Sequence, residues 1–172
     1  MNKIFTFCSV VSVVLLLNSI PLFSQWEQCN GPYGGYITAF AIDSYGNIFA
    51  GTYGGGVFLS TNNGNSWTEV NNGLTNRTVR AIAISGSNIF AGTWGGGVFL
   101  STNNGSSWTD VGLTNKNVQA IAISGSNIFI GTDGSSVFKA NLNDFITGLV
   151  DNKYSNSKIK IFPNPSPEQT SI

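Results

Sequence analysis

A stretch of 24 residues occurs twice in the sequence, and this repetition limits the possible folds more than any other feature. Asn88–Val111 repeats Asn47–Val70 at an offset of 41 residues, with 21 of 24 positions identical. The three differences are Tyr53/Trp94, Asn65/Ser106 and Glu69/Asp110. A third, weaker copy over Ala120–Gly131 matches Ala81–Gly92 at an offset of 39 with one change, Ala91/Ile130. The chain is therefore expected to repeat one structural unit of about 40 residues.

Each unit contains short segments with the alternation of β-strands. Val79–Ile84 places alanines on one face and isoleucines on the other, which favours an inner strand buried between two sheets. Glycine-containing turns then lead to three further strands, Asn88–Thr93, Val98–Thr102 and the outer strand Trp108–Val111. The sequence predicts an all-β, β-propeller-like array of about three four-stranded blades over residues 37–78, 79–117 and 118–147. Such an array is either a partial propeller or one completed by an oligomer.

The composition indicates one globular domain and argues against nucleic acid as a partner. The 172 residues are 41% hydrophobic and 9% charged, and they contain 21 glycines and no histidine. Eight basic and eight acidic residues cancel, so no broad positive field is available for nucleic acid or anionic lipid.

The first 24 residues have the pattern of a secretory signal peptide. A short positive start, Met1–Lys3, precedes the apolar run Ile4–Leu17, which is shorter than the ~20 residues of a membrane-spanning helix. Removal of this segment would remove Cys8 and leave Cys29 as a single thiol. A lone thiol in an exported protein is either buried or able to pair between chains, and we expect Cys29 to be buried.

A second motif lies between the third and fourth strands of each full repeat. Ser60–Trp67 and Ser101–Trp108 resemble the Asp-box, or bacterial neuraminidase repeat, Ser/Thr-x-Asp/Asn-x-Gly-x-x-Trp/Phe. The matching residues are Ser60, Asn62, Gly64, Trp67, Ser101, Asn103, Gly105 and Trp108. The resemblance implies a structural role, with Asn bonding its own turn and Trp covering the hairpin.

The two ends of the array are expected to be incomplete in complementary ways. The third copy loses the box, because Val137–Phe145 has no glycine or tryptophan at the matching places. At the other end, Trp26 lies 41 residues before Trp67, so Trp26–Cys29 is predicted to be an outer strand without a blade of its own. Either two chains form a six-blade ring in which each Trp26 strand clasps the partner's third blade, or the natural chain is longer.

The C-terminal residues resemble a secretion signal. Residues 148–157 form a polar linker, and residues 158–172 begin with Lys158–Pro165, which looks like the opening of the C-terminal sorting domain of the type IX secretion system. This resemblance implies a truncated sorting domain, the type IX machinery as a partner, and a secreted or cell-surface protein exported through the periplasm of a Gram-negative bacterium. The alternative is an extended surface tail with a proline turn.

Candidate ligand-binding residues occupy positions at which the repeats differ. Tyr53, Trp94 and Asp133 are equivalent to one another, as are Thr38, Arg80 and Gln119 at the starts of the inner strands, and Arg77 and Lys116 lie in the connecting loops. An aromatic ring beside glycines can stack on a sugar, and an arginine can hold a carboxylate. The alternative is that Tyr53 and Trp94 cover neighbouring hairpins.

Catalytic, metal-binding and cofactor-binding residues are not expected. Sialidases, which carry this box, use a cluster of arginines, whereas only Arg77 and Arg80 are present here. Duplicated blades also place like groups around an axis, whereas glycoside hydrolysis needs two carboxyls about 5–10 Å apart. We expect an exported, non-catalytic propeller-type binding or scaffold module with a glycan or protein ligand, and with a homo-oligomer as one way to close the propeller. The alternative is a fragment of a larger Asp-box glycoside hydrolase, sialidase-like or xyloglucan-hydrolase-like.

Overall fold

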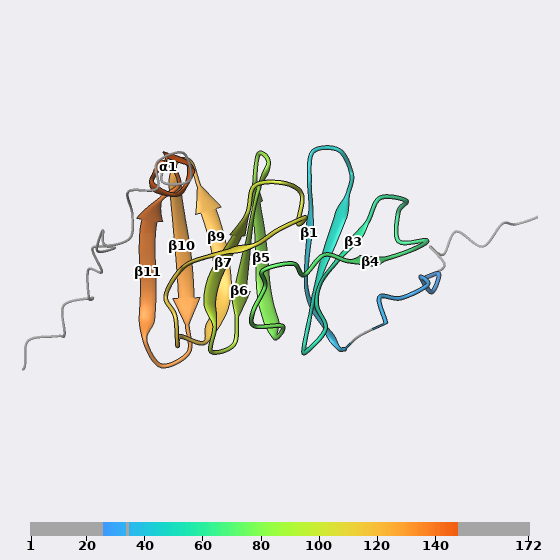
Figure 1. The fold of residues 1–172 in the computed structure, drawn as a ribbon, viewed down its shortest axis with the longest axis horizontal. Coiled ribbons are helices and arrows are strands. Elements are labelled where there is room, and N and C mark those ends of the chain that lie inside the picture. Colours follow the sequence, from blue (N-terminus) through green and yellow to red (C-terminus); the bar gives the residue numbers. More distant parts are fainter. Residues whose placement is uncertain (1–25, 34, 148–172) are drawn as a thin grey trace, which may run out of the picture.

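The computed structural model describes residues 26–33 and 35–147, which form three antiparallel sheets side by side (Figure 1). The first sheet comprises β1 (Ile37–Ile42), β2 (Ile48–Thr52), β3 (Gly56–Ser60) and β4 (Thr68–Glu69). The second comprises β5 (Val79–Ser85), β6 (Asn88–Thr93), β7 (Gly97–Ser101) and β8 (Thr109–Gly112). The third comprises β9 (Val118–Ser124), β10 (Asn127–Thr132) and β11 (Ser136–Asn141), followed by the helix α1 (Asn143–Thr147).

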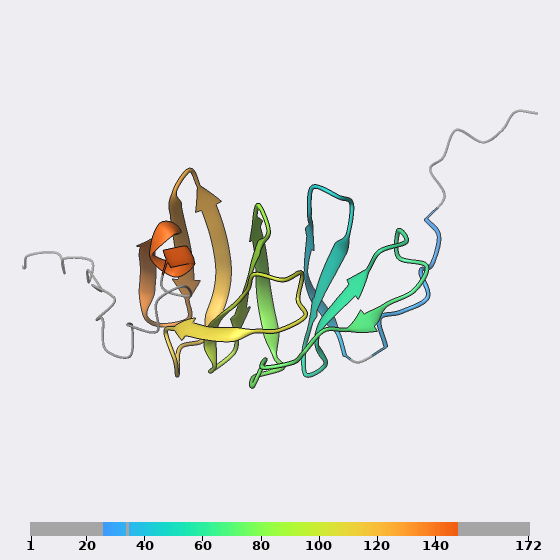
Figure 2. The same ribbon diagram turned by 45° about the horizontal axis from the view of Figure 1, so that its top comes forward.

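The arrangement of the sheets is that of propeller blades. Strands pair in sequence order within each sheet, and the first strands β1, β5 and β9 pack next to one another. Figure 2 shows the sheets fanning outward from these strands. The predicted all-β, propeller-like fold is confirmed, and we refer to the sheets as blades 1, 2 and 3.

The second hairpin of each blade is fastened by a threonine. The Thr52 hydroxyl donates to the Gly56 carbonyl at 3.0 Å, and Thr93 does the same to Gly97 at 3.0 Å. Gly56 and Gly97 have φ values of 86° and 79°, which favour glycine at this position, and in blade 3 Ser136 adopts the same conformation with a φ of 77°. The loops of these hairpins, β2–β3, β6–β7 and β10–β11, all lie at the lower edge in Figure 1.

A glycine in the second strand of blades 1 and 2 receives a side chain of the next blade. A Cβ placed on Gly51 would lie 2.8 Å from Val79 Cγ1 and 3.3 Å from Ile82 Cδ1. Gly92 has the same relation to Val118 and Ile121 of blade 3. The blades can approach this closely only because these positions lack a side chain. We call Gly51, Gly92 and the equivalent Gly131 the socket glycines.

Two hydrophobic cores lie between the blades. The core between blades 1 and 2 contains Phe49, Val57, Leu74, Val79, Ile82, Ile89, Ala91, Phe99 and Trp108. The core between blades 2 and 3 contains Phe90, Val98, Leu100, Val118, Ile128, Ile130 and Leu142. Blade 2 therefore contributes opposite faces of the same strands to both cores, as expected from its two-sided apolar pattern.

The two box-like segments form the same hydrogen-bonded turn. Asn103 Oδ1 accepts from the Ser107 backbone N–H and the Ser101 hydroxyl, each at 2.9 Å, and Ser101 Oγ accepts from the Gly105 N–H at 2.9 Å. The bonds of Asn62 and Ser60 are equivalent. The resemblance to the Asp-box thus corresponds to a turn that satisfies its own backbone groups.

The two box tryptophans differ in their surroundings. Trp108 is 4% exposed, packs in the core between blades 1 and 2, and donates its indole N–H to the Val70 carbonyl at 2.6 Å. Trp67 is only partly buried, contacts Phe40 with ring centroids 6.3 Å apart, and has a buried indole nitrogen without a hydrogen-bond partner. The residue equivalent to Val70 on this side of blade 1 is Cys29, whose carbonyl accepts from the Gly31 N–H at 3.1 Å instead.

Blade 3 has three strands, as the loss of its box suggested. After β11 the chain turns into α1, which begins beyond Leu142. The ring of Phe145 meets Phe90 edge-on at 5.7 Å, where blade 2 has Trp108 packed near Phe49. A short helix with a phenylalanine thus takes part of the place of the missing outer strand.

The expectations for the N-terminal residues need correction. Residues 26–33 form no strand, and Trp26 is 98% exposed. The reason is geometric. These residues lie beside blade 1, whereas blade 3, the blade without an outer strand in the described residues, lies at the opposite end of the array (Figure 1). Cys29 is an exposed free thiol and is not buried as expected.

The remaining segment predictions lie outside the described residues. They are the signal peptide at 1–24, the linker at 148–157 and the sorting motif at 158–172. Within the described part of the chain, no helix has the length and apolar character needed to cross a membrane.

Candidate functional site

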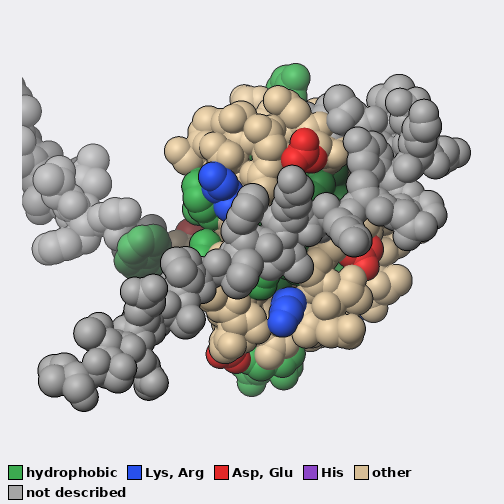
Figure 3. All heavy atoms as spheres, turned by 90° about the vertical axis from the view of Figure 1, so that its left-hand side faces the viewer, with side chains coloured by type: hydrophobic (Ala, Val, Ile, Leu, Met, Phe, Trp, Pro, Cys, Tyr) green, Lys and Arg blue, Asp and Glu red, His purple; other side chains and the backbone are tan. Residues whose placement is uncertain are grey.

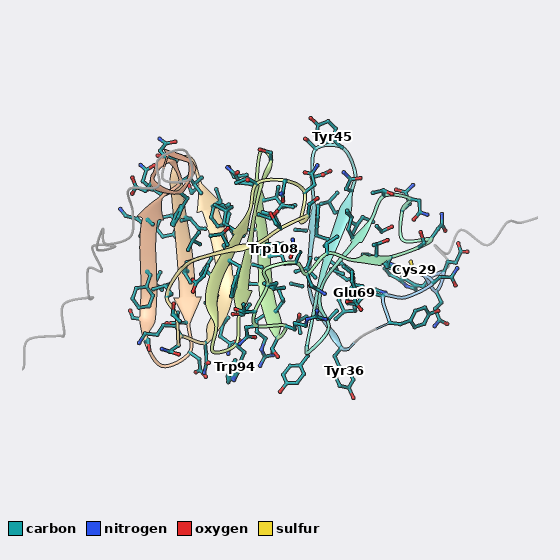
Figure 4. The ribbon with its side chains drawn as sticks, in the orientation of Figure 1. Cys29, Tyr36, Tyr45, Glu69, Trp94 and Trp108 are labelled. Atoms are coloured by element: carbon teal, nitrogen blue, oxygen red, sulfur yellow. The ribbon has the colours of Figure 1, made fainter. Side chains whose placement is uncertain are left out.

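A cluster of two aromatic rings and one arginine stands at the lower edge of blades 1 and 2. The Arg80 guanidinium lies 4.8 Å from the Trp94 ring centroid and 5.8 Å from that of Tyr53. Tyr53 remains 53% exposed and Trp94 36% exposed. We call these three residues the aromatic–arginine platform, and Figure 4 shows Trp94 at this edge, together with Tyr36.

A β-bulge directs Arg80 into the platform. Val79 pairs with Thr93 and Ala81 with Gly92, so the register shifts at Arg80 and leaves it without a partner on β6. Such a bulge re-aims the extra side chain. The same shift occurs in blades 1 and 3, where it involves Thr38 and Gln119. Each blade therefore presents a variable residue at this point, and only blade 2 presents a cation.

The Arg80 guanidinium lacks internal partners for its charge. Its Nε is buried without a hydrogen-bond acceptor, and in the described part of the chain no carboxylate forms an ion pair with it. The two rings attract the cation through their faces, but they supply no acceptor oxygen. A ligand that brings a carboxylate or another acceptor to this edge would meet unused donors.

Backbone hydrogen bonds hold the rings in place. The Tyr53 N–H donates to the Tyr36 carbonyl and the Trp94 N–H to the Thr78 carbonyl, each at 2.9 Å. The Asn76 side-chain amide also donates to the Trp94 carbonyl at 2.9 Å. These bonds fix the main chain at both aromatic residues, and Arg80 contacts the rings themselves.

The other predicted ligand residues are not part of the platform. The Arg77 side chain pairs with Glu69 at 3.5 Å, both half exposed, and Lys116 reaches the Ser135 hydroxyl at 3.3 Å. Asp133 is exposed in the β10–β11 loop, and among the described residues no ion pair joins it to Arg80. The structure thus brings together three of the six candidates.

Tyr36 is a component of the site that the sequence reasoning missed. It is 85% exposed, and its carbonyl accepts the bond that positions Tyr53. Its place just before β1 is equivalent to that of Thr78 before β5, so the repeat alignment contained the signal. An aromatic residue at a position where the other repeats have Thr78 and Asn117 marks an additional variable site.

The opposite edge of blade 1 carries a carboxylate with a structural role. Burial raises the pKa of Asp43, but hydrogen bonds from the Asn47 side chain and from the N–H groups of Asn47 and Tyr45 outweigh burial and hold the pKa below its usual value. In the described chain no group of three or more His, Cys, Asp or Glu side chains is arranged to hold a metal ion.

Known proteins share the fold. No family model matches the sequence, and a search of curated proteins gives no significant match. Among solved structures, an ancestral GH74 enzyme is similar with 28% identity and a TM-score of 0.54, covering 64% of this chain and 15% of that chain.

Two further similar structures belong to different kinds of protein. One is the extracellular domain of a putative hybrid two component system from B. thetaiotaomicron, with 21% identity, a TM-score of 0.54, and 63% of this chain against 15% of that chain covered. The other is YCF48 bound to D1 peptide, with 15% identity, a TM-score of 0.50, and 63% against 38% covered. This chain spans well under half the length of each of the three, and the likeness is one of propeller architecture.

Proposed function

We propose that this protein is an exported, non-catalytic binding module whose ligand site is the aromatic–arginine platform. The observation that carries the proposal is Arg80, held between the Tyr53 and Trp94 rings with a buried Nε that has no acceptor. Exposed aromatic faces suit the apolar face of a sugar ring, and a guanidinium suits a carboxylate. The ligand class that fits both is a glycan that carries an acidic group.

A peptide with an acidic side chain is the second candidate ligand. It would use the same guanidinium, and one similar structure is described as a protein with a bound peptide. The fold itself gives no preference, because similar structures include an enzyme, the extracellular domain of a putative two component system and this peptide complex.

The competing function is a fragment of a larger glycoside hydrolase. The GH74 similarity favours it, but the described carboxylates lie in separate places. Asp43 is bound within its own loop, Glu69 pairs with Arg77, and Asp110 accepts from the Gly112 N–H at 2.8 Å. We also propose that the binding module is exported through the periplasm to the cell surface or medium, with the type IX machinery as a partner.

Glycan and peptide arrays test the proposal. We expect hits with acidic glycans that weaken at least tenfold for Trp94→Ala and for Arg80→Gln, because each removes one of the two recognition elements. The thermal midpoint should change little for Trp94→Ala, since the ring is one-third exposed. Tyr45→Ala is the matched control, because Tyr45 is equally aromatic, 86% exposed and located at the opposite edge (Figure 4).

Three outcomes would contradict the proposal. The first is binding that is unaffected by both platform substitutions, and the second is loss of folding with Trp94→Ala, which would place that ring in the core. The third is hydrolysis of a bound glycan by the purified chain, which would favour the hydrolase alternative.

A further inference from the structure

We propose that a second copy of this chain closes the array into a six-blade ring, with Trp26 of each copy inserted between blades 2 and 3 of the other. Five observations support this interface independently of the proposed ligand site. They concern a hollow, the exposed ring of Trp26, an unpaired strand edge, a pair of open blade faces and the position of Cys29.

The first observation is an apolar hollow between blades 2 and 3. Its lining residues include Val98, Val111, Leu113, Ile128 and Phe138, and its volume is about 360 Å³ including its open mouth. The equivalent residues between blades 1 and 2 are Val57, Val70, Leu74, Ile89 and Phe99, and these surround Trp108. The hollow thus lies where the other repeat junction holds a tryptophan, and Phe145 is one of its lining residues.

The second observation is that the side chain of Trp26 is almost fully exposed. It lies 41 residues before Trp67 and 82 before Trp108, and it is 98% exposed. Its own hollow is out of reach, because residues 26–33 lie beside blade 1 and β11 lies at the far end of the array in both ribbon views. A partner chain can supply the ring, and Val111 would then offer its carbonyl to the indole as Val70 does to Trp108.

The third observation concerns the strand edge that Trp26 would bring with it. In blades 1 and 2 the outer strand pairs Leu59 with Thr68 and Leu100 with Thr109. The same register sets Lys139 of β11 opposite Glu27 of the partner, two exposed residues of opposite charge. Figure 3 looks onto the blade 3 end, where charged side chains stand among hydrophobic ones. Opposite charges directly across an antiparallel pair stabilise it.

The outward faces of blades 1 and 3 are equivalent to the two faces that pack against each other wherever two blades meet within the chain. Ile82 packs on Gly51 and Ile121 on Gly92, whereas the third socket glycine, Gly131, meets only Ala120. The residue equivalent to Ile82 and Ile121 in blade 1 is Phe40, which is 59% exposed. Phe40 of the partner would occupy the open socket and bury an apolar face that a single chain leaves in water.

The fifth observation is that Cys29 lies beside blade 1 where an outer strand would place it, although residues 26–33 form no strand in the single chain. Cys29 Sγ lies 3.0 Å from a Cβ placed on Gly64, and Val70 Cγ2 lies 3.0 Å from a Cβ placed on Gly105. Because Cys29 is 41 residues before Val70 and Gly64 is 41 before Gly105, Cys29 stands to blade 1 as Val70 of blade 1 stands to blade 2. Three blades from each chain give six, within the range of closed propellers.

Light scattering on the purified chain tests the ring. We expect a mass twice that of the 18.2 kDa chain. Trp26→Ala should raise the dissociation constant of the dimer about 30-fold or more, because a buried tryptophan is a typical interface hot spot. Tyr45→Ala is the control and should leave the dimer intact, while circular dichroism should show that both variants are folded.

Charge reversal gives a test of the register itself. Glu27→Lys and Lys139→Glu should each weaken the dimer about tenfold, since each places like charges opposite one another at both interfaces. An equimolar mixture of the two variants should dimerise again, because every pair in the mixed dimer joins one cation to one anion or restores the original pair. A stable monomer, an open polymer, or a dimer insensitive to Trp26→Ala and to both reversals would overturn the proposal.

Discussion

The two box tryptophans allow a comparison within one molecule, because their local sequences are nearly identical and only their neighbours differ. Trp108 is 4% exposed, so its ring removes about 200 Å² from water, and burial at about 25 cal/mol per Å² sets an upper bound near 5 kcal/mol. Its hydrogen bond to Val70 adds about 1 kcal/mol, and the alanine retained at the site subtracts part of the burial. We expect Trp108→Ala to lower the free energy of unfolding by about 3–5 kcal/mol.

Trp67→Ala is the matched control. This ring is partly exposed and its indole nitrogen has no acceptor, so we expect about half the loss or less. Urea unfolding followed by far-UV circular dichroism measures both values, in a Trp26→Ala background so that ring closure does not bury Trp67. Equal losses for the two variants, or a loss below about 1 kcal/mol for Trp108→Ala, would refute the view that the packing between blades sets the stability of each blade.

Three further expectations follow from single positions. Gly92→Ala should destabilise the chain by about 1–3 kcal/mol because its Cβ would collide with Val118, whereas Gly131→Ala should be neutral in the monomer, where its nearest neighbour is at 3.5 Å; thermal melts of both compare them. Asn103→Ala should cost about 1–2 kcal/mol in urea unfolding and Asn103→Asp less, because the aspartate keeps both acceptor bonds. The depressed pKa of Asp43 contributes stability that is present above the unfolded pKa of about 3.9 and is lost as pH falls through the lower folded value, so Asp43→Asn should flatten the acid side of the stability profile.

The sequence was sufficient to predict the blades because their information is local. Alternating residues in Val79–Ile84 and glycine turns between consecutive strands define hairpins whose partners are neighbours in the chain. Duplication then made the comparison of equivalent positions reliable, including the loss of the outer strand after Val137–Phe145. The bounds of β5–β8 differ from the expected segments by only one residue or so.

The features that were not predicted depend on contacts between distant parts. Whether residues 26–29 form a strand depends on which blade edge is within reach, and no pattern inside the segment contains this information. The exposure of Cys29 follows from the same cause. The insertion of Arg80 between Tyr53 and Trp94 requires a bulge whose position is visible only from the pairing of β5 with β6. The structure brings three of the six candidate ligand residues together, and this grouping came from the structure and not from the sequence.

Because of the socket glycines, the number of blades can change without a change in the sequence of any one blade. The sockets at Gly51 and Gly92 accept the same kind of side chain from the next blade, and every blade is assembled from consecutive strands. Addition of one more unit of 41 residues would create one more joint of the kind already present between Gly51 and Ile82 and would leave the existing joints unchanged. Stability in such an array grows joint by joint, as it does in other repeat proteins. Gene duplication can therefore lengthen this chain freely, and only the angle at which the last socket meets the first blade selects the lengths that close.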